Sequence, residues 1–183
     1  MSDRENSMLK GARPPDETPA FEEEKFVSFR VGEGLYLIEI LRVKEVVRAR
    51  KITVIPNSPP EIAGVIDLRG AYVPILDMRA RTGLAMDEPT PMSRIIVSVV
   101  RGRVAGLLVD ELLPVMRVLP SKMKPPPRMT KDLGYDFLTA MCTRDGKVYM
   151  LINSDRLLDP VSERGGTPPG AIRGAEERAG ATE

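Results

Sequence analysis

The side chains that most often carry out chemistry are sparse in this 183-residue sequence. It contains no histidine and one cysteine, Cys142. Without imidazole there is no Ser-His or Cys-His dyad and no histidine-bound metal. A single cysteine can form neither an internal disulfide nor a cysteine-based zinc site. These counts disfavour catalysis, and we expect Cys142 to be a buried, unreactive strand residue.

Two pairs of carboxylates remain as candidates for acid–base chemistry or for binding a divalent cation. They are the adjacent Asp110 and Glu111, and Asp67 with Asp77. Neither pair has a third group that would converge with it, and acidic residues beside β-turns usually cap the turn or face solvent. No glycine-rich loop opens a helix with lysine, as a phosphate cradle would require. We therefore expect no enzyme activity, no metal site and no cofactor.

Charge and composition limit the classes of partner. The chain has 27 Lys and Arg against 26 Asp and Glu, which excludes a uniformly basic binder of nucleic acid or membrane. A small β-barrel that binds nucleic acid stays as an alternative, but it would need exposed aromatic residues, and the chain has four Phe, four Tyr and no Trp. No apolar run approaches the ~20 residues of a membrane span. The polar N-terminus shows no signal-peptide pattern, so we expect a cytoplasmic protein.

Composition changes twice along the chain. Residues 1–24 hold seven acidic and three basic residues with several prolines, which predicts a disordered acidic arm. Residues 160–183 are rich in Gly, Pro and Ala, which predicts a flexible tail. The body between them, 25–159, has 21 basic and 15 acidic residues. A basic body between acidic ends hints at an acidic partner, although a solvated mixed surface explains it as well.

Alternation of β-branched and polar residues between turn signals predicts ten short strands in the body. They cover residues 26–31, 35–38, 44–51, 62–68, 72–76, 95–100, 104–109, 115–119, 137–143 and 148–152. Five strands bury little apolar surface alone, so we expect a mainly β fold of two five-stranded, barrel-like halves that share a core, about 25–90 and 91–159. Residues 38–43 and 59–63 could each form one helical turn. Ser154–Leu158, capped by Asn153 or Ser154, predicts a short C-terminal helix.

Several of these segments together resemble a known family. Val27-Ser28-Phe29, Leu41-Arg42-Val43, Gly106-Leu107-Leu108-Val109-Asp110 and Asp155-Arg156-Leu157-Leu158 contribute, and the strand–turn–strand from Gly64 to Asp77 is the most specific. In this pattern the body resembles the CheW-type chemotaxis coupling proteins. The resemblance implies two SH3-like barrels and a non-catalytic adaptor. Such an adaptor joins a CheA-type histidine kinase to the cytoplasmic tips of chemoreceptors, in chemotaxis or a similar pathway, in the cytoplasm at receptor clusters.

The resemblance also implies roles for individual residues. Glu45 and Arg69 match positions important for receptor and kinase coupling that can form an ion pair. Ile40, Val43 and Val46 match the receptor-contacting stretch, although each could equally face the core. Leu112, Val115 and Val118 fall on the edge strand expected to contact the kinase. In the family, the adaptor and the kinase regulatory domain resemble each other, which allows the two to associate in alternating rings. A domain that binds kinase but not receptor stays as an alternative.

We expect Gly64, Gly70 and Gly106 to be structural, at turns or close approaches of the backbone. Three residues depart from the family pattern. Asp67 stands where Asn is usual and could compete with Glu45 for Arg69. Pro114 interrupts the kinase-facing strand and requires an edge or a bulge there. Ala140 replaces a common glycine. These changes leave the predicted fold intact but put the identity of the partners in question.

Overall fold

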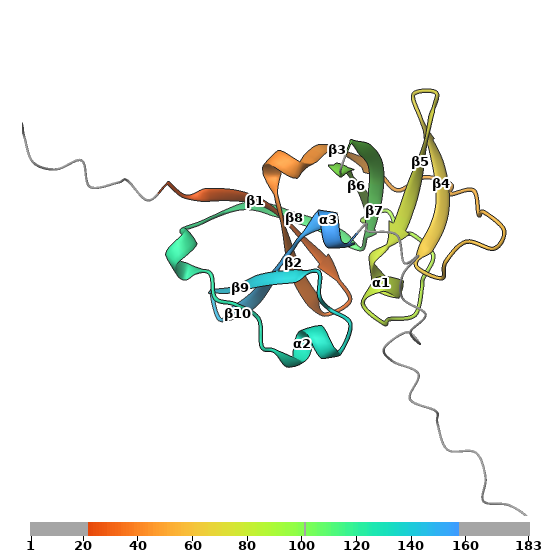
Figure 1. Cartoon of the computed structure of the whole chain (residues 1–183). Coiled ribbons are helices and arrows are strands. Elements are labelled where there is room, and N and C mark those ends of the chain that lie inside the picture. The colour runs from red at the N-terminus through yellow and green to blue at the C-terminus, as the bar shows by residue number, and fades with distance from the viewer. Residues whose placement is uncertain (1–21, 101, 158–183) are drawn as a thin grey trace, which may run out of the picture.

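The computed structural model describes residues 22–100 and 102–157 (Figure 1). All ten predicted strands are present: β1 Glu24–Val31, β2 Gly34–Glu39, β3 Val43–Arg48, β4 Ile62–Leu68, β5 Ala71–Asp77, β6 Arg94–Val100, β7 Arg103–Val109, β8 Glu111–Val118, β9 Leu138–Arg144 and β10 Lys147–Ile152. β8 begins four residues earlier than predicted and continues through Pro114. Most of the predicted arm and the whole predicted tail lie outside the described residues.

The strands form two five-stranded sheets, which confirms the mainly β prediction. The order in the first sheet is β8-β1-β2-β10-β9, and the order in the second sheet is β3-β6-β7-β5-β4. The predicted division into residues 25–90 and 91–159 is therefore wrong. β6 and β7 belong with β3–β5, whereas β1 and β2 belong with β8–β10. Periodicity predicts strands but not their partners, and β2 pairs in parallel with the distant β10.

Both sheets have the same topology, with β8, β9, β10, β1 and β2 taking the places of β3, β4, β5, β6 and β7. Each contains one parallel pair, β2–β10 or β5–β7. In each, the segment after one end strand forms an isolated bridge to the other end strand. Thr53 bonds to Val65 of β4 through N–O distances of 2.8 and 2.9 Å, and Lys124 bonds to Met141 of β9 through 2.8 and 2.7 Å. Both sheets are therefore bent so that their ends approach each other.

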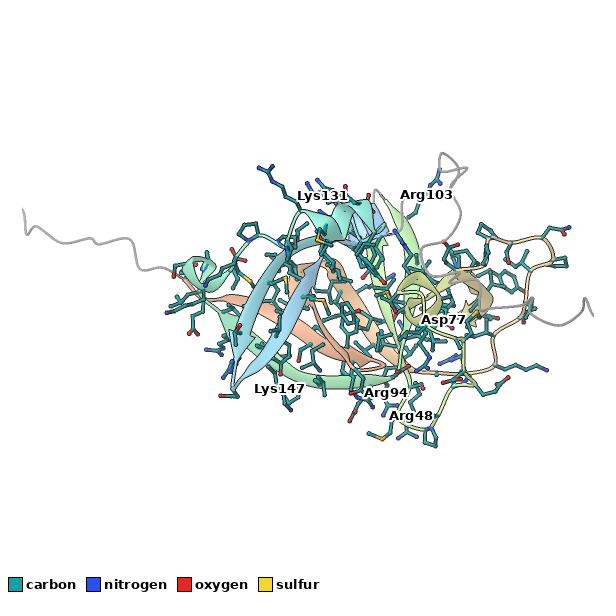
Figure 2. All side chains as sticks on the ribbon, turned by 90° about the horizontal axis from the view of Figure 1, so that it is seen from below. Arg48, Asp77, Arg94, Arg103, Lys131 and Lys147 are labelled. Carbon is teal, nitrogen blue, oxygen red and sulfur yellow. The ribbon has the colours of Figure 1, made fainter. Side chains whose placement is uncertain are left out.

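One apolar core joins the two sheets, as predicted. Its buried members come from both: Val27, Phe29, Val31, Tyr36, Ile38, Phe137, Leu138, Ile152 and Leu157 lie on the side of the first sheet, and Leu76, Met78, Ile96, Leu107 and Val109 on the side of the second. Each sheet also has a smaller cluster of its own. Charged side chains such as Arg103, Lys131 and Lys147 point outward (Figure 2). Burial of this shared surface holds the sheets together.

In the part of the chain that the structure describes, helical structure is confined to short turns. The predicted C-terminal helix is α3, Ser154–Leu157, and Asn153 caps it by accepting a hydrogen bond from the amide of Arg156 at 3.1 Å. The turn predicted in residues 38–43 is the 3-10 turn η1, Ile40–Arg42, whereas residues 59–63 form no helix. The sequence did not indicate α1 Met78–Arg81, α2 Met129–Asp132 or the 3-10 turn η2 Pro120–Lys122. Within the described ranges, no helix has the length and apolar character needed to span a membrane.

Candidate functional site

Glu45 and Arg69 form an ion pair across the two ends of the second sheet. Glu45 lies on the end strand β3, and Arg69 lies in the turn of the β4–β5 hairpin, whose tip projects from the molecule (Figure 1). Nη2 of Arg69 is 2.9 Å from Oε2 of Glu45. Arg69 and Gly70 have φ angles of 57° and 84°, a left-handed pair that makes a tight hairpin turn. The carboxylate is 20% exposed and the guanidinium side chain 79% exposed, so the arginine presents the pair to solvent.

Asp67 stabilises the same turn and does not compete with Glu45 for the side chain of Arg69. Its Oδ1 accepts a hydrogen bond from the amide of Gly70 at 2.7 Å, and its backbone carbonyl accepts one from Arg50 at 3.4 Å. Within the described residues Asp67 forms no ion pair, so the competition for Arg69 that the sequence left open does not occur. An aspartate here restrains the loop that carries the arginine.

The three aliphatic residues expected to contact the receptor lie between core and surface. Ile40, Val43 and Val46 are half-buried, and each packs against the core shared by the sheets. Leu41, between them in η1, is 94% exposed, and the sequence reading missed it. Successive residues of a helical turn point in different directions, so the packing of Ile40 against the core leaves Leu41 pointing outward. The sequence did offer a signal: Ile40 and Leu41 are adjacent apolar residues in a predicted helical turn, so they could not both face the core.

The three residues expected to contact the kinase do not share one face. β8 is an end strand, and its one strand partner within residues 22–100 and 102–157 is β1. Leu112 and Val115 are 37% and 54% exposed, but Val118 is 7% exposed and packs in the first sheet's own cluster with Phe26, Leu37, Met116 and Cys142. The prediction that Val118 contacts the kinase is therefore wrong, because its side chain belongs to the core. Near Pro114 the register with β1 shifts between Phe26 and Ser28, the irregularity that a proline in this strand predicted.

The three glycines occupy positions where a side chain would be strained or crowded. Gly64 has φ 142°, and a Cβ atom there would lie 2.2 Å from the carbonyl oxygen of Thr53. Gly70 has the left-handed φ of the β4–β5 turn. A Cβ atom on Gly106 would lie 2.6 Å from Ile75 and 2.7 Å from Ile95. All three glycines therefore have a structural role, because the local backbone or its neighbours disfavour a side chain there.

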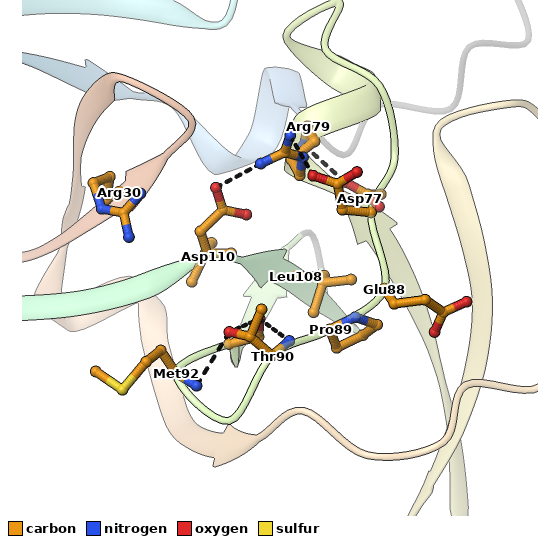
Figure 3. Close-up of a pocket in the computed structure, with 12 residues that line it drawn as sticks. Arg30, Asp77, Arg79, Glu88, Pro89, Thr90, Met92, Leu108 and Asp110 are labelled. Carbon is orange, nitrogen blue, oxygen red and sulfur yellow. Dashed lines mark hydrogen bonds and ion pairs between the residues drawn. The ribbon is translucent and has the colours of Figure 1, made fainter.

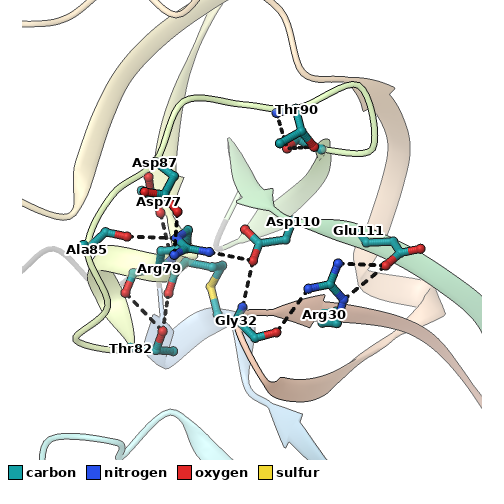
Figure 4. A network of polar contacts seen from close by, with 12 residues as sticks. Arg30, Gly32, Asp77, Arg79, Thr82, Ala85, Asp87, Thr90, Asp110 and Glu111 are labelled. Carbon is teal, nitrogen blue, oxygen red and sulfur yellow. Dashed lines mark hydrogen bonds and ion pairs between the residues drawn. The ribbon is translucent and has the colours of Figure 1, made fainter.

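The carboxylates considered for catalysis have structural partners (Figure 4). Asp110 Oδ2 is 2.9 Å from Nη1 of Arg79 and accepts the Gly32 amide at 2.7 Å, and Glu111 pairs with Arg30 at 2.9 Å. Asp77 caps α1 by accepting the amides of Arg79 and Ala80 at 2.7 and 3.3 Å. Burial raises the pKa of Asp77, and these amide bonds oppose the shift.

A pocket of about 270 Å³ lies beside this network and includes Arg30, Arg79 and Asp110 in its lining (Figure 3). In its wall Arg79 pairs with Asp87 at 2.7 Å and with Asp110 at 2.9 Å, and Arg30 pairs with Glu111 at 2.9 Å. Within residues 22–100 and 102–157, no group of three or more His, Cys, Asp or Glu residues is placed to bind a metal ion. The arrangement ties α1 to the β1–β2 turn and the start of β8.

Two other titratable groups are held in their neutral forms. Burial raises the pKa of the Cys142 thiol, with Arg144 opposing the shift, so the thiolate is disfavoured. Burial, aided by the charge of Tyr135 and opposed by a hydrogen bond with Thr82, raises the pKa of Tyr36 to about 12. Both side chains pack in apolar clusters.

These features define the class of molecule. Two bent sheets with a shared core present an exposed ion pair at one place. At another they present the end strand β8, which exposes aliphatic side chains and whose outer edge has no strand partner among the described residues. Exposed charged and apolar groups on a rigid β scaffold are typical of a domain that binds other proteins.

The chain belongs to the CheW family: a family model described as CheW-like domain matches residues 25–161. It is 34% identical over 135 residues to a probable chemotaxis protein CheW of Rhizobium etli, covering 74% of this chain and 87% of that one. It is 30% identical over 144 residues to the protein FrzA of Myxococcus xanthus, covering 78% and 89%. The solved structure of the scaffolding protein TtCheW of Thermoanaerobacter tengcongensis matches with a TM-score of 0.68 and 33% identity, over 75% of this chain and 93% of that one.

Proposed function

We propose that this protein is a non-catalytic adaptor that couples a CheA-type histidine kinase to the cytoplasmic tips of chemoreceptors, in chemotaxis or a similar pathway. Membership of the CheW family supports the class of function. The exposed Glu45–Arg69 pair is the observation that carries the assignment to this chain. The proposed place of action is the cytoplasm, at receptor clusters, where adaptor and kinase domains associate in rings.

The proposed receptor surface surrounds η1 and β3. Arg69 and Leu41 are its most exposed parts, at 79% of the side chain and 94% of the residue. The surface also includes three half-buried aliphatic residues that pack against the core: Ile40, Val43 and Val46. An apolar stripe on a helical hairpin could pack against the aliphatic groups while the ion pair fixes its orientation, because charge pairs give specificity more than affinity.

The proposed kinase surface is the outer edge of β8. One side of this strand bonds to β1 and the other has no strand partner among the described residues. Leu112 and Val115 expose aliphatic side chains beside the edge. An open edge can accept a strand of another domain through main-chain hydrogen bonds. Because β8 and β3 belong to different sheets, one molecule could hold both partners.

Binding measurements with purified partners test the bridge. We expect the protein to retain a CheA-type kinase and a receptor cytoplasmic fragment, each separately and both together, and to raise receptor-dependent kinase autophosphorylation. Retention of the kinase alone would replace the bridging function by the kinase-only alternative. Binding of neither, with retardation of a nucleic acid in a gel at moderate salt, would favour the nucleic-acid alternative. Turnover of a substrate by the purified chain would overturn the non-catalytic assignment.

A further inference from the structure

The acidic arm enters the fold beside a basic group of side chains. Antiparallel pairing places Lys25 opposite Arg117 and Glu24 opposite Val118. The chain that precedes Glu24 therefore starts alongside the segment that follows Val118, which contains Lys122 in η2 and Lys124 at the bridge to β9. Figure 1 shows the start of β1 and η2 at the same end of the molecule. We call Lys25, Arg117, Lys122 and Lys124 the basic end.

The charges of the basic end are not neutralised by the rest of the described chain. All four residues are exposed, and none forms an ion pair with another described residue. Lys25 and Arg117 are like charges directly opposite each other on neighbouring strands, an arrangement that destabilises a sheet. The sequence adds to the imbalance, because residues 112–131 contain five basic residues and no acidic one.

The second sheet also has two like charges on opposite residues of neighbouring strands, but there one of the two side chains has hydrogen-bond partners. Arg48 of β3 lies opposite Arg94 of β6 (Figure 2). Nη1 of Arg94 donates to the carbonyl oxygens of Pro91 and Ser93, each at 2.8 Å, so the loop before β6 takes up its hydrogen bonds. Lys25 and Arg117 have no such side-chain hydrogen bond within the described residues. Because nothing in the described chain offsets the repulsion between Lys25 and Arg117, an anionic group bound at the basic end would stabilise it.

We propose that this occupant is the protein's own acidic arm, whose carboxylates Asp16, Glu17, Glu22 and Glu23 are attracted to the basic end by longer-range electrostatics rather than by fixed ion pairs. The arm has seven acidic and three basic residues in positions 1–24. Glu24 lies eight positions after Asp16, a reach of up to roughly 26–29 Å when extended, enough for the arm to fold back across η2. Tethering gives a short segment an effective concentration on the order of millimolar, which favours it over a free acidic partner.

Paramagnetic relaxation enhancement in the full chain tests the contact. A nitroxide on Ala12→Cys, in a Cys142→Ala background, is expected to broaden the amides of Lys122 and Lys124 at ~0.05 M salt, and the broadening should fall by at least about half at ~0.5 M salt because of screening. Lys122→Glu with Lys124→Glu should abolish it. The matched control, Lys44→Glu with Lys51→Glu, changes the net charge equally at exposed sites in β3 and in the segment that follows it, and should leave the broadening intact.

A charge swap separates contact from mere proximity. Glu22→Lys and Glu23→Lys, added to Lys122→Glu and Lys124→Glu, should restore the salt-sensitive broadening, as coupled sites do in a double-mutant cycle. Broadening that ignores salt and the Lys122/Lys124 reversal would overturn the proposal. Broadening that appears only between a labelled and a separate isotope-enriched molecule would assign the surface to the arm of a second copy and would also overturn it.

Discussion

The two sheets have one topology but differ in what connects their ends. Ser28 of β1 and Val97 of β6 each lie three residues before the end of their strand, and their partners are Leu113 in β8 and Glu45 in β3. The counterpart of Arg69 is Asp145, in the β9–β10 turn. The first sheet thus has Leu113 and Asp145 where the second has the Glu45–Arg69 pair. Because the first sheet forms without such a pair, the fold does not require it, which favours a role in binding.

The largest effect on stability is expected at Gly64 of β4, whose equivalent position in β9 of the first sheet is Ala140. Both precede the residue that forms the isolated bridge, Val65 or Met141, but only Gly64 has a positive φ. We expect Gly64→Ala to lower the free energy of unfolding by about 2–4 kcal/mol, because its Cβ would meet the Thr53 carbonyl and its φ disfavours a side chain. Ala140→Gly should cost only about 0.5–1 kcal/mol. Urea titrations measure both, and equal costs would refute the asymmetry.

The next effect concerns the ion pair itself. Arg69→Glu should reduce receptor-dependent kinase activation about tenfold, since it places two carboxylates together at the proposed receptor surface. Its unfolding free energy should change by no more than about 1 kcal/mol, because exposed pairs contribute little. Asp145→Lys, the matched change in the first sheet, should leave activation unaltered. An unfolded Arg69→Glu protein, or normal activation by it, would remove Arg69 from the coupling site.

A smaller effect distinguishes the two helix caps. Asp77 caps α1, and its counterpart Asn153 caps α3. Burial raises the folded pKa of Asp77 above its ordinary 3.8, so the folded state binds a proton more readily than the unfolded state. Its contribution to stability is complete below pH 3.8 and is lost as pH rises through the folded pKa. Relative to Asp77→Asn, the natural protein should therefore lose stability over that window. Denaturation of both proteins at several pH values measures this change, and a natural protein that gains stability relative to Asp77→Asn as pH rises would contradict the prediction.

The smallest effect is expected on the edge of β8. Val115→Ser should change the unfolding free energy by no more than about 0.5 kcal/mol, because the side chain is 54% exposed. It should weaken kinase binding a few-fold. Val148→Ser on β10, where the side chain is 46% exposed, provides a control that should not affect kinase binding. Equal kinase affinity for both variants, measured by calorimetry, would remove β8 from the interface.

Local pattern was enough for the strands, the β4–β5 turn and the C-terminal cap, because alternation, Arg69-Gly70 and Asn153 each act within a few residues. Partner choice was not accessible, since the pairing of β2 with β10 depends on contacts over more than a hundred residues. The face of an apolar residue also escaped prediction. Val118 turns inward beyond the irregularity at Pro114, and Leu41 turns outward in η1, although both are ordinary aliphatic residues in the sequence.

The interleaved strand order has a consequence for synthesis. β3–β7 are contiguous in the chain, so the second sheet has all its strands once Val109 has been made. The hairpin of β1 and β2 is translated first, yet it waits for β8–β10 before its neighbours exist. We expect stalled nascent chains to gain protease resistance in the later-made sheet before the N-terminal hairpin does. Until then, Phe26 and Leu37 of that hairpin lack the partners Met116 and Cys142 that bury them in the finished protein.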